Sequence, residues 1–349
     1  MVKPSSVSGV VLDIDWEKMV DINLPLAFVS RKVEYDGKEV ENRNEYYGEM
    51  MLIGDLHIGH RDHSGNPLNA HLHFLEEHPH IQIGLMGDYI EYSVNTAHVQ
   101  EQTMDVDAQI DTFIKKFKPL KDRIAFMLWG NHEERYVKST KSSHPGTALL
   151  GSLAREIGVS EHCYVAEPQR GVFCSIKAGD NIYGMYAQHG ATGAISNDFY
   201  QQKRTAQSNN VSIIAQGHTH RLGWAPLTEK SMEVLGDNTT GMITRRRWLV
   251  STGCFLKEPG YAEARSYPYT IVGAPVIRFY SSKEKIDFTE LSQDYKDYIT
   301  KGGINFGAEV GVEDWTGLRR EEYEGSPTIE PLQSSSEVIK RITPCLDPR

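Results

Sequence analysis

The sequence predicts an α/β layered core, and three observations lead to this prediction. Between residues 50 and 217, short apolar runs recur that end in Gly or His followed by polar residues, as buried strands do. Stretches with helix-like composition or apolar residues at helical spacing lie near several of these runs. Such alternation of strands and helices is typical of helices layered on a sheet.

Five apolar runs are the predicted central strands. They are MMLIG (50–54), IQIGLMG (81–87), IAFMLWG (124–130), IYGMYAQHG (182–190) and VSIIAQG (211–217). Three later runs are also predicted as strands, without clear helices between them: WLVSTGCF (248–255), APVIRFY (274–280) and EKIDFTEL (284–291). None approaches the roughly 20 apolar residues that a membrane-spanning helix needs.

Three segments are predicted as helices. NAHLHFLEEH (69–78) precedes the second central strand, and VDAQIDTFIKKFKPLKD (106–122) has apolar residues at helical spacing before the third. TALLGSLAREIG (147–158) follows the third strand. Its last residue, Gly158, is expected to end the helix as a C-cap.

The chain is expected to have three parts. Residues 1–45 form an N-terminal extension in which VVLDIDW (10–16) and LAFVSRKVEY (26–35) are candidate strands. Residues 46–290 form the main domain, whose apolar pattern begins at about Glu49. Residues 291–349 are richer in Gly, Ser, Glu and Pro, and we expect them to form a partly disordered tail.

The composition is that of a globular protein, with 39% apolar and 24% charged residues among 349. A net charge of −10 argues against a broadly basic surface that coats nucleic acid. It leaves a nucleic-acid substrate open, because bound cations can supply positive charge locally. The four scattered cysteines form no disulfide framework, and the first residues do not form a secretory signal. We therefore expect a cytoplasmic protein with no membrane partner.

Residues with metal-binding side chains follow all five central strands. They are Asp55 and His57, Asp88, Asn131, His189, and His218 and His220. Residues two apart in an extended chain point the same way, so we expect the side chains within each D-x-H or H-x-H pair to aim at one point. A glycine precedes four of the motifs, which predicts a tight backbone there. One such motif is weak evidence, but five in one chain predict a metal centre. Their donors suit Mn, Fe or Zn better than Ca.

In this order, the motifs D-x-H, G-D, G-N-H-E, H and G-H-x-H resemble those of the calcineurin-like metallophosphoesterases over residues 49–255. The resemblance implies a four-layer αββα sandwich of two mixed sheets flanked by helices, with a dinuclear metal site at the strand ends. It implies that His132 is a catalytic residue beside the leaving-group oxygen. It also implies two sets of ligands that share a bridging Asp88: Asp55, His57, Asp88 and His220 for one ion, and Asp88, Asn131, His189 and His218 for the other.

The implied function is phosphoester hydrolysis with two divalent ions, Mn²⁺ first and Fe, Zn or Ni as alternatives. A metal-bridging hydroxide would attack phosphorus in line. With Ile58-Gly59 after the first motif, the pattern is similar to the DNA-repair nuclease branch, which favours a phosphodiesterase or nuclease acting on DNA or a nucleotide. The alternatives are a phosphomonoesterase (a protein or small-molecule phosphatase) and a nucleotide pyrophosphatase. A non-catalytic scaffold would be expected to lack metal ligands, and all seven are present.

Further candidates lie beside the motifs. Glu91 could orient a ligand histidine, as outer carboxylates commonly do. His60 could reach the substrate, and Arg135 and Arg221 could bind phosphate, although loop arginines are usually just solvated. The basic run at 245–247 could touch a nucleic-acid backbone or simply begin a strand.

Overall fold

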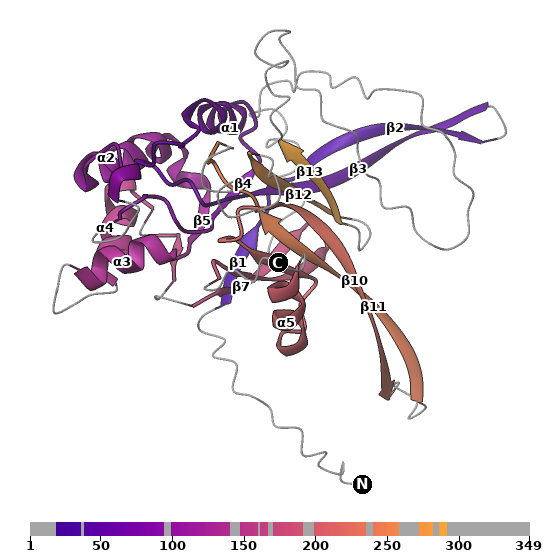
Figure 1. The fold of residues 1–349 in the computed structure, drawn as a ribbon. Helices are drawn as coiled ribbons and strands as arrows, with labels where there is room; N and C mark the ends of the chain where they lie inside the picture. Colours follow the sequence, from indigo (N-terminus) through magenta and orange to yellow (C-terminus); the bar gives the residue numbers. More distant parts are fainter. Residues whose placement is uncertain are drawn as a thin grey trace. The chain divides into compact units, whose positions relative to one another are not determined.

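The structure is a computed structural model, which divides into two units, Met1–Gly311 and Val312–Arg349 (Figure 1). The residues described below all lie in the first unit. They are 19–35, 38–93, 99–139, 147–159, 161–166, 170–190, 199–234, 240–257, 272–281 and 286–291. The candidate strand at 10–16 and residues 292–349 of the predicted tail lie outside them, so the three-part division of the chain stays a prediction.

The first sheet is built around the strands at 50–54, 81–87 and 124–130, which are confirmed. Its strand order is β13-β12-β3-β4-β5-β6, and β2 pairs with β3. Neighbours from β3 to β6 are parallel, while β2, β12 and β13 pair antiparallel. The bounds are β2 Ala27–Tyr35, β3 Lys38–Ile53, β4 Gln82–Leu85, β5 Ile124–Met127, β6 Tyr164–Val165, β12 Ala274–Tyr280 and β13 Ile286–Leu291. The candidate strand at 26–35 is therefore confirmed as β2.

The second sheet has the order β1-β7-β8-β9-β11-β10. Its strands are β1 Met19–Asn23, β7 Val172–Ala178, β8 Asn181–Gln188, β9 Ile213–Gln216, β10 Leu222–Val234 and β11 Thr240–Thr252. The pairs β1–β7, β8–β9 and β9–β11 are parallel, and the other two are antiparallel. The predicted β8, β9 and β11 are confirmed. The sequence did not predict β10, which contains Pro226, a residue tolerated where a strand lies at the end of a sheet.

The three predicted helices are present as α1 (Gly65–Glu77), α2 (Val106–Phe117) and α4 (Thr147–Ile157). Asp105 caps α2 by accepting from the Ala108 N–H at 2.8 Å. Gly158 ends α4 with φ +93, which confirms it as the C-cap. Two further helices, α3 (Asn131–Ser139) and α5 (Tyr200–Ser208), were not predicted because they are short and polar. Short 3₁₀ helices span Val99–Glu101 and Lys118–Arg123.

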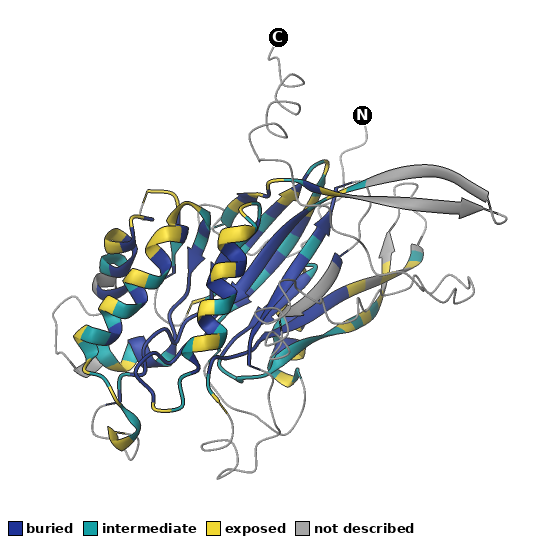
Figure 2. Ribbon diagram, turned by 90° about the horizontal axis from the view of Figure 1, so that it is seen from above, coloured by how far each residue is buried: buried dark blue, intermediate teal, exposed yellow. Residues whose placement is uncertain are grey.

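The two sheets pack face to face, with helices outside them. The hydroxyl of Tyr183 in β8 donates to the Tyr280 carbonyl of β12 at 2.7 Å, and its ring lies 5.2 Å from that of Phe279. Helices α1 to α4 lie beside the sheet that contains β4 and β5, while α5 packs against β9 and β11 (Figure 1). Figure 2 shows buried strands beneath helices whose outer faces are exposed. The predicted four-layer αββα sandwich of two mixed sheets is confirmed.

Helix α2 also fixes the loop that follows β4. The ring of Tyr89 stacks on Phe113 of α2 at 4.6 Å, and both rings are fully buried. The Tyr89 hydroxyl donates to the Leu128 carbonyl at 2.8 Å. Burying an aromatic side chain stabilises by about 1.5–3 kcal/mol, so this contact anchors the loop firmly. No helix among the described residues is long and apolar enough to cross a membrane.

A buried ion pair joins β3 to β12 away from the strand ends. Glu49 accepts from Arg278 Nε at 2.9 Å and from His80 Nε2 at 2.8 Å, and the Arg278 guanidinium lies 4.0 Å from the centre of the Tyr47 ring. Burial acts to raise the pKa of Glu49, but His80 and Arg278 hold it below its ordinary value. The folded state therefore favours the carboxylate.

We predict that Glu49→Gln lowers the free energy of unfolding at pH 7 by about 2 kcal/mol, because Arg278 loses its buried partner. Since the pKa of Glu49 is lower in the folded state, its contribution is present above pH about 4.5 and is lost as the pH falls through the folded-state pKa. Urea unfolding at pH 7 and pH 4 should show the difference between wild type and variant shrinking in acid.

The matched control is Glu229→Gln, which removes a Glu–Arg pair of the same 2.9 Å length whose carboxylate is 35% exposed. It should cost less than about 1 kcal/mol. Equal losses for the two variants would contradict a special role for the buried pair.

Candidate metal centre

The residues predicted as ligands come together in the structure from the ends of five strands. Asp55 and His57 follow β3, Asp88 follows β4, Asn131 begins α3 just after β5, His189 follows β8, and His218 and His220 follow β9. Because β3, β4 and β5 are parallel neighbours, their carboxyl ends meet at one sheet edge. Three groups have ligand atoms that all lie within 4.8 Å of one another: Asp55, His57 and His220; His57, Asp88 and His132; and Asp88, His189 and His218.

The backbone brings these side chains together in a way that the sequence analysis did not predict. The predicted extended backbone at the D-x-H and H-x-H pairs is wrong. Strand β3 ends at Ile53 and β9 at Gln216, so both pairs lie beyond the strands. Five predicted ligands instead have left-handed backbones with φ between 49 and 64: Asp55, His57, Asp88, His218 and His220. Non-glycine residues seldom adopt this region, and such residues concentrate at functional sites. The turns, and not the strands, aim the side chains.

Two glycines allow the loops after β4 and β5 to approach each other. A Cβ on Gly130 would lie 2.1 Å from the backbone nitrogen of Asp88, and one on Gly87 would lie 2.6 Å from the nitrogen of Gly130. Gly87 also has φ +94. The predicted tight backbone before Asp88 and Asn131 is therefore confirmed, since any side chain at either glycine would separate the two loops.

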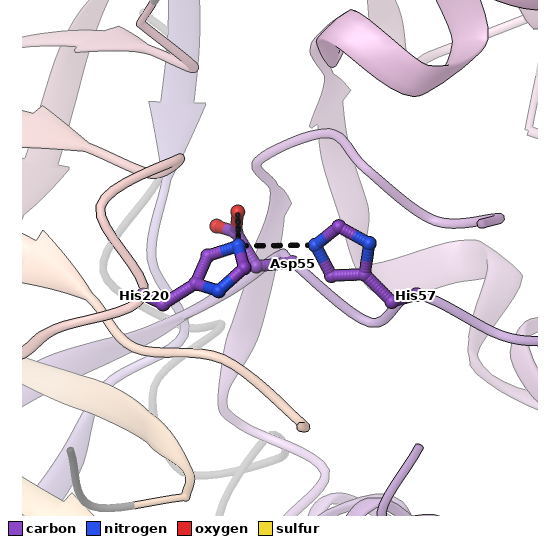
Figure 3. Close-up of side chains that lie close together, drawn as sticks. All are labelled: Asp55, His57 and His220. Atoms are coloured by element: carbon purple, nitrogen blue, oxygen red, sulfur yellow. Dashed lines mark hydrogen bonds and ion pairs between the residues drawn. The ribbon is translucent and has the colours of Figure 1, made fainter. Parts of the chain in front are cut away.

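The first group brings three potential metal-ligand atoms together, and Asp88 lies nearby. His57 Nε2 lies 3.1 Å from His220 Nε2, which lies 3.3 Å from Asp55 Oδ1 (Figure 3). His57 Nε2 is also 3.9 Å from Asp88 Oδ2. Neighbouring ligand atoms about 2.1 Å from one ion lie roughly 3.0–3.4 Å from each other, so the contacts of His220 with His57 and Asp55 fit a coordination shell, whereas the separation between His57 and Asp88 is longer than this range.

The second group brings acceptors together on the other side of Asp88. His189 Nε2 lies 3.2 Å from both Asp88 Oδ2 and Asn131 Oδ1. The same Asn131 oxygen is 3.1 Å from Asp88 Oδ2 and 2.7 Å from His218 Nδ1. His189 Nδ1 contacts the Met86 carbonyl at 2.8 Å, so a neutral ring donates there and presents its Nε2 lone pair to the group. The reversed Asn131 amide would donate to His189, Asp88 and His218, whereas with its oxygen toward them the group is a set of acceptors around one point. Imidazole, carboxylate and amide oxygen together fit a divalent metal.

The charges of the group support the same conclusion. Asp55 and Asp88 are 0% and 1% exposed. Burial acts to raise the pKa of both carboxyls, yet neighbouring histidines hold it below the ordinary value. Burial acts to lower the pKa of His189, but Asp88 and Asp55 raise it to about 10. Two buried carboxylates thus draw positive charge to this point, as a proton or as a metal ion.

Glu91 lies where an orienting role requires it. Its Oε2 is 2.8 Å from His57 Nδ1, and its Oε1 accepts from the Ser93 hydroxyl at 2.9 Å. Burial acts to raise the pKa of Glu91, but His57 lowers it to about 2, so the carboxylate is ionised at neutral pH. With a proton on Nδ1, His57 presents the lone pair of Nε2 to the first group.

Glu133 was missed as a site residue, although it belongs to the G-N-H-E motif. Its fully buried carboxylate accepts from four backbone N–H groups: those of Asp88 (2.9 Å), Tyr89 (2.7 Å), Ile90 (3.3 Å) and Gly130 (2.9 Å). Burial and the charge of Asp88 raise the pKa of Glu133 to about 7, while the four donors favour its ionised form. The carboxylate holds the loop after β4 against the start of α3.

Gln109 of α2 is a second residue that no motif indicated. Its Oε1 accepts from the backbone N–H groups of Glu91 at 3.0 Å and Tyr92 at 3.3 Å, and its Nε2 donates to the Met104 carbonyl at 2.9 Å. The side chain is fully buried. Gln109 thus holds Glu91, which in turn contacts His57. Gln109 lies in a segment whose pattern indicates only an amphipathic helix, so the sequence alone does not indicate that it holds Glu91 in place.

His132 lies beside the ligands, at the start of α3. Its backbone N–H donates to Asp88 Oδ1 at 2.9 Å, and its ring meets that of His57 edge-on at 4.7 Å. Its Nδ1 contacts the Glu91 carbonyl, and its Nε2 lies 3.3 Å from an Arg135 terminal nitrogen. His132 therefore lies beside His57 and Asp88, where the sequence analysis expected a catalytic residue.

The structure does not bring every candidate into the three groups. His60 is buried elsewhere, where its Nδ1 accepts from the Asp62 N–H at 3.0 Å and its Nε2 lies 3.6 Å from Glu101. Arg221 is half-buried, and its carbonyl accepts from the Gly253 N–H at 2.7 Å. In the basic run, Arg247 is buried and pairs with Glu229, as a structural residue of β11 does.

Comparisons with known proteins are remote. No protein-family model and no curated protein matches the chain. Similar solved structures include a predicted phosphoesterase from Streptococcus pneumoniae TIGR4, which is 13% identical with a TM-score of 0.32 over 70% of this chain and 90% of that chain. Vps29 from Cryptosporidium parvum is 12% identical with a TM-score of 0.37 over 71% of this chain and 93% of that chain. The E. coli phosphoesterase YfcE is 12% identical with a TM-score of 0.31 over 68% of this chain and 96% of that chain. Structural similarity this remote does not indicate which reaction the chain carries out.

We predict that Glu91→Gln weakens binding of the ion held by His57 about tenfold or more and leaves the other ion unchanged, because a neutral amide orients His57 less firmly. Titration with Mn²⁺ followed by electron paramagnetic resonance measures both affinities. Glu101→Gln is the matched control, since Glu101 neighbours His60 outside the three groups. Equal Mn²⁺ affinities in the two variants would contradict the orienting role.

Proposed function

We propose that this chain is a dinuclear metal-dependent phosphoester hydrolase. The observation that carries the proposal is the convergence of buried acceptors on both sides of Asp88. In one group Asp88 lies with His57, and in the other it lies 3.2 Å from His189 Nε2. A carboxylate shared in this way is suited to bridge two ions, which would be held by the seven residues that the sequence analysis assigned.

The charge of such a centre suits a phosphate group. Two divalent ions bring about four positive charges, while Asp55 and Asp88 bring two negative ones and the other ligands bring none. When bound, the ions supply a hydroxide nucleophile near neutral pH and stabilise charge on the phosphoryl oxygens. The net positive charge attracts a phosphoester even though the whole chain carries −10.

His132 is the proposed proton donor to the departing oxygen. The Glu91 carbonyl beside its Nδ1 can only accept, so Nδ1 carries a proton. Nε2 then accepts from an Arg135 N–H at 3.3 Å, and a transferable proton held at Nε2 for the departing oxygen would replace this contact. Proton transfer of this kind typically contributes a factor of about 10²–10⁴.

Two classes of substrate follow. The sequence of the metal motifs, with Ile58-Gly59 after the first of them, favours a phosphodiesterase or nuclease that uses Mn²⁺. The second candidate is a phosphomonoesterase, and one observation favours it: Arg135 lies beside His132, where a terminal phosphate could meet a guanidinium. The Mn²⁺ preference in either case rests on the donor set of imidazole, carboxylate and amide oxygen.

We predict that Asp88→Asn abolishes turnover and weakens binding of both ions by more than about tenfold, because the amide removes the shared charge. His132→Ala should keep both ions and lower kcat by about 10²–10⁴. Metal analysis after dialysis and Mn²⁺-dependent hydrolysis of a nitrophenyl ester provide the two readouts. Undiminished turnover of His132→Ala would exclude its proposed role, and unchanged metal content in Asp88→Asn would exclude a shared ligand.

A comparison of substrates separates the two classes. Bis-nitrophenyl phosphate, nitrophenyl phosphate and single-stranded or linear DNA are offered to the Mn²⁺-loaded protein. Cleavage of the diester and DNA without the monoester supports the diesterase or nuclease, and the converse supports the monoesterase. Hydrolysis of none of them by a protein that holds two ions would contradict the proposed function for these classes of ester.

A further inference from the structure

Helix α3 places an arginine at the edge of the candidate metal centre. Arg135 follows His132 by three residues and Asn131 by four, so all three share one face of the helix. One terminal nitrogen of Arg135 lies 3.3 Å from His132 Nε2, and the other lies 3.0 Å from the amide nitrogen of Asn131. The side chain is exposed.

No carboxylate among the described residues forms an ion pair with Arg135. Other arginines of the described regions do have such partners: Arg278 pairs with Glu49 at 2.9 Å, and Arg247 pairs with Glu229 at 2.9 Å. An arginine keeps its charge at any pH at which the protein is folded. The guanidinium of Arg135 is therefore a cation that the described parts of the chain do not neutralise.

With a cation among His218, His189 and Asp88, the oxygen of the Asn131 amide would face these residues and the contact between Arg135 and Asn131 would join two donors. Without a cation, the reversed amide donates to the same residues and its oxygen accepts from Arg135 at 3.0 Å. It is therefore the cation that would turn the amide nitrogen toward Arg135. Two N–H donors 3.0 Å apart gain no attraction from each other, but both can donate to one anionic oxygen placed beside them.

We propose that Arg135 is a specificity-determining residue that binds a non-bridging oxygen of the substrate's phosphoryl group and favours a phosphate with two negative charges. The inference rests on the proposed function. Near neutral pH a monoester carries close to two negative charges, whereas a diester carries one. A cation beside the leaving-group histidine therefore stabilises a bound monoester more than a bound diester.

The experiment uses Arg135→Ala and Arg135→Lys, with Arg155→Ala as the matched control. Arg155 is an exposed arginine on α4 whose side chain, among the described residues, donates to the Gly151 carbonyl and the Ser152 hydroxyl. Three quantities are measured on Mn²⁺-loaded protein: metal content, affinity for inorganic phosphate by calorimetry, and kcat/KM for nitrophenyl phosphate and bis-nitrophenyl phosphate.

We expect Arg135→Ala to retain both ions, to weaken phosphate binding about tenfold, and to lower kcat/KM for the monoester by about the same factor. The value for the diester should change by less than about threefold. Arg135→Lys should recover part of the phosphate affinity, because it restores the charge without the planar fork. Arg155→Ala should resemble wild type in every measurement.

Unchanged phosphate affinity in Arg135→Ala, with metal content intact, would overturn the inference and leave the proposed function standing. Equal losses for monoester and diester would also overturn it, since Arg135 would then not discriminate between charges. If the wild-type protein held no metal and cleaved neither ester, the proposed function would fail and the inference would fail with it.

Discussion

Two buried carboxylates, Asp55 and Asp88, lie at the junction of the loops that follow β3, β4 and β9, and the arrangement of the site depends on them. Each is almost completely removed from solvent. An isolated buried carboxylate is costly, so such a group must be paired, coordinated or protonated. The Asp55 carboxylate accepts from the His218 N–H at 3.0 Å, and Asp88 Oδ1 accepts from the His132 N–H at 2.9 Å. The oxygens thereby hold the histidine-bearing loops while a cation would balance the remaining charge.

The left-handed residues of these loops require firm support from the surrounding fold. Each such residue costs of order 1–3 kcal/mol and persists only where neighbouring contacts determine it. Glu133 supplies four of these contacts to the loop after β4 and to Gly130, and Tyr89 supplies apolar packing against α2. The same loop holds Glu91, so its support also fixes the orientation of His57. Stability and site geometry are therefore coupled through a few buried side chains.

Most of the scaffold could be predicted from local sequence, and the site geometry only in part. Buried strands such as β4 and β12 are mostly apolar runs, and α2 has apolar residues at helical spacing, so these patterns identified them. Helix α3 was missed because its polar sequence NHEERYVKS has no apolar face to detect. The metal motifs indicated which donors to expect, but not the left-handed backbone that aims them. The role of Gln109 depends on hydrogen bonds to Glu91 and Tyr92, which precede it by 18 and 17 residues in the sequence. A local sequence pattern does not encode such contacts.

In the proposed function, one segment, the unpredicted helix α3, would contact both a cation and an anion. Because the helix begins directly after β5, its first residue, Asn131, lies between the candidate ligands and the outer surface of α3. In that function, the amide oxygen would face His189 and the bound ion while the amide nitrogen faced Arg135, so the two ends of one side chain would separate a cation position from an anion position. In the proposed function, the orientation of this single amide would link metal binding to the recognition of phosphate.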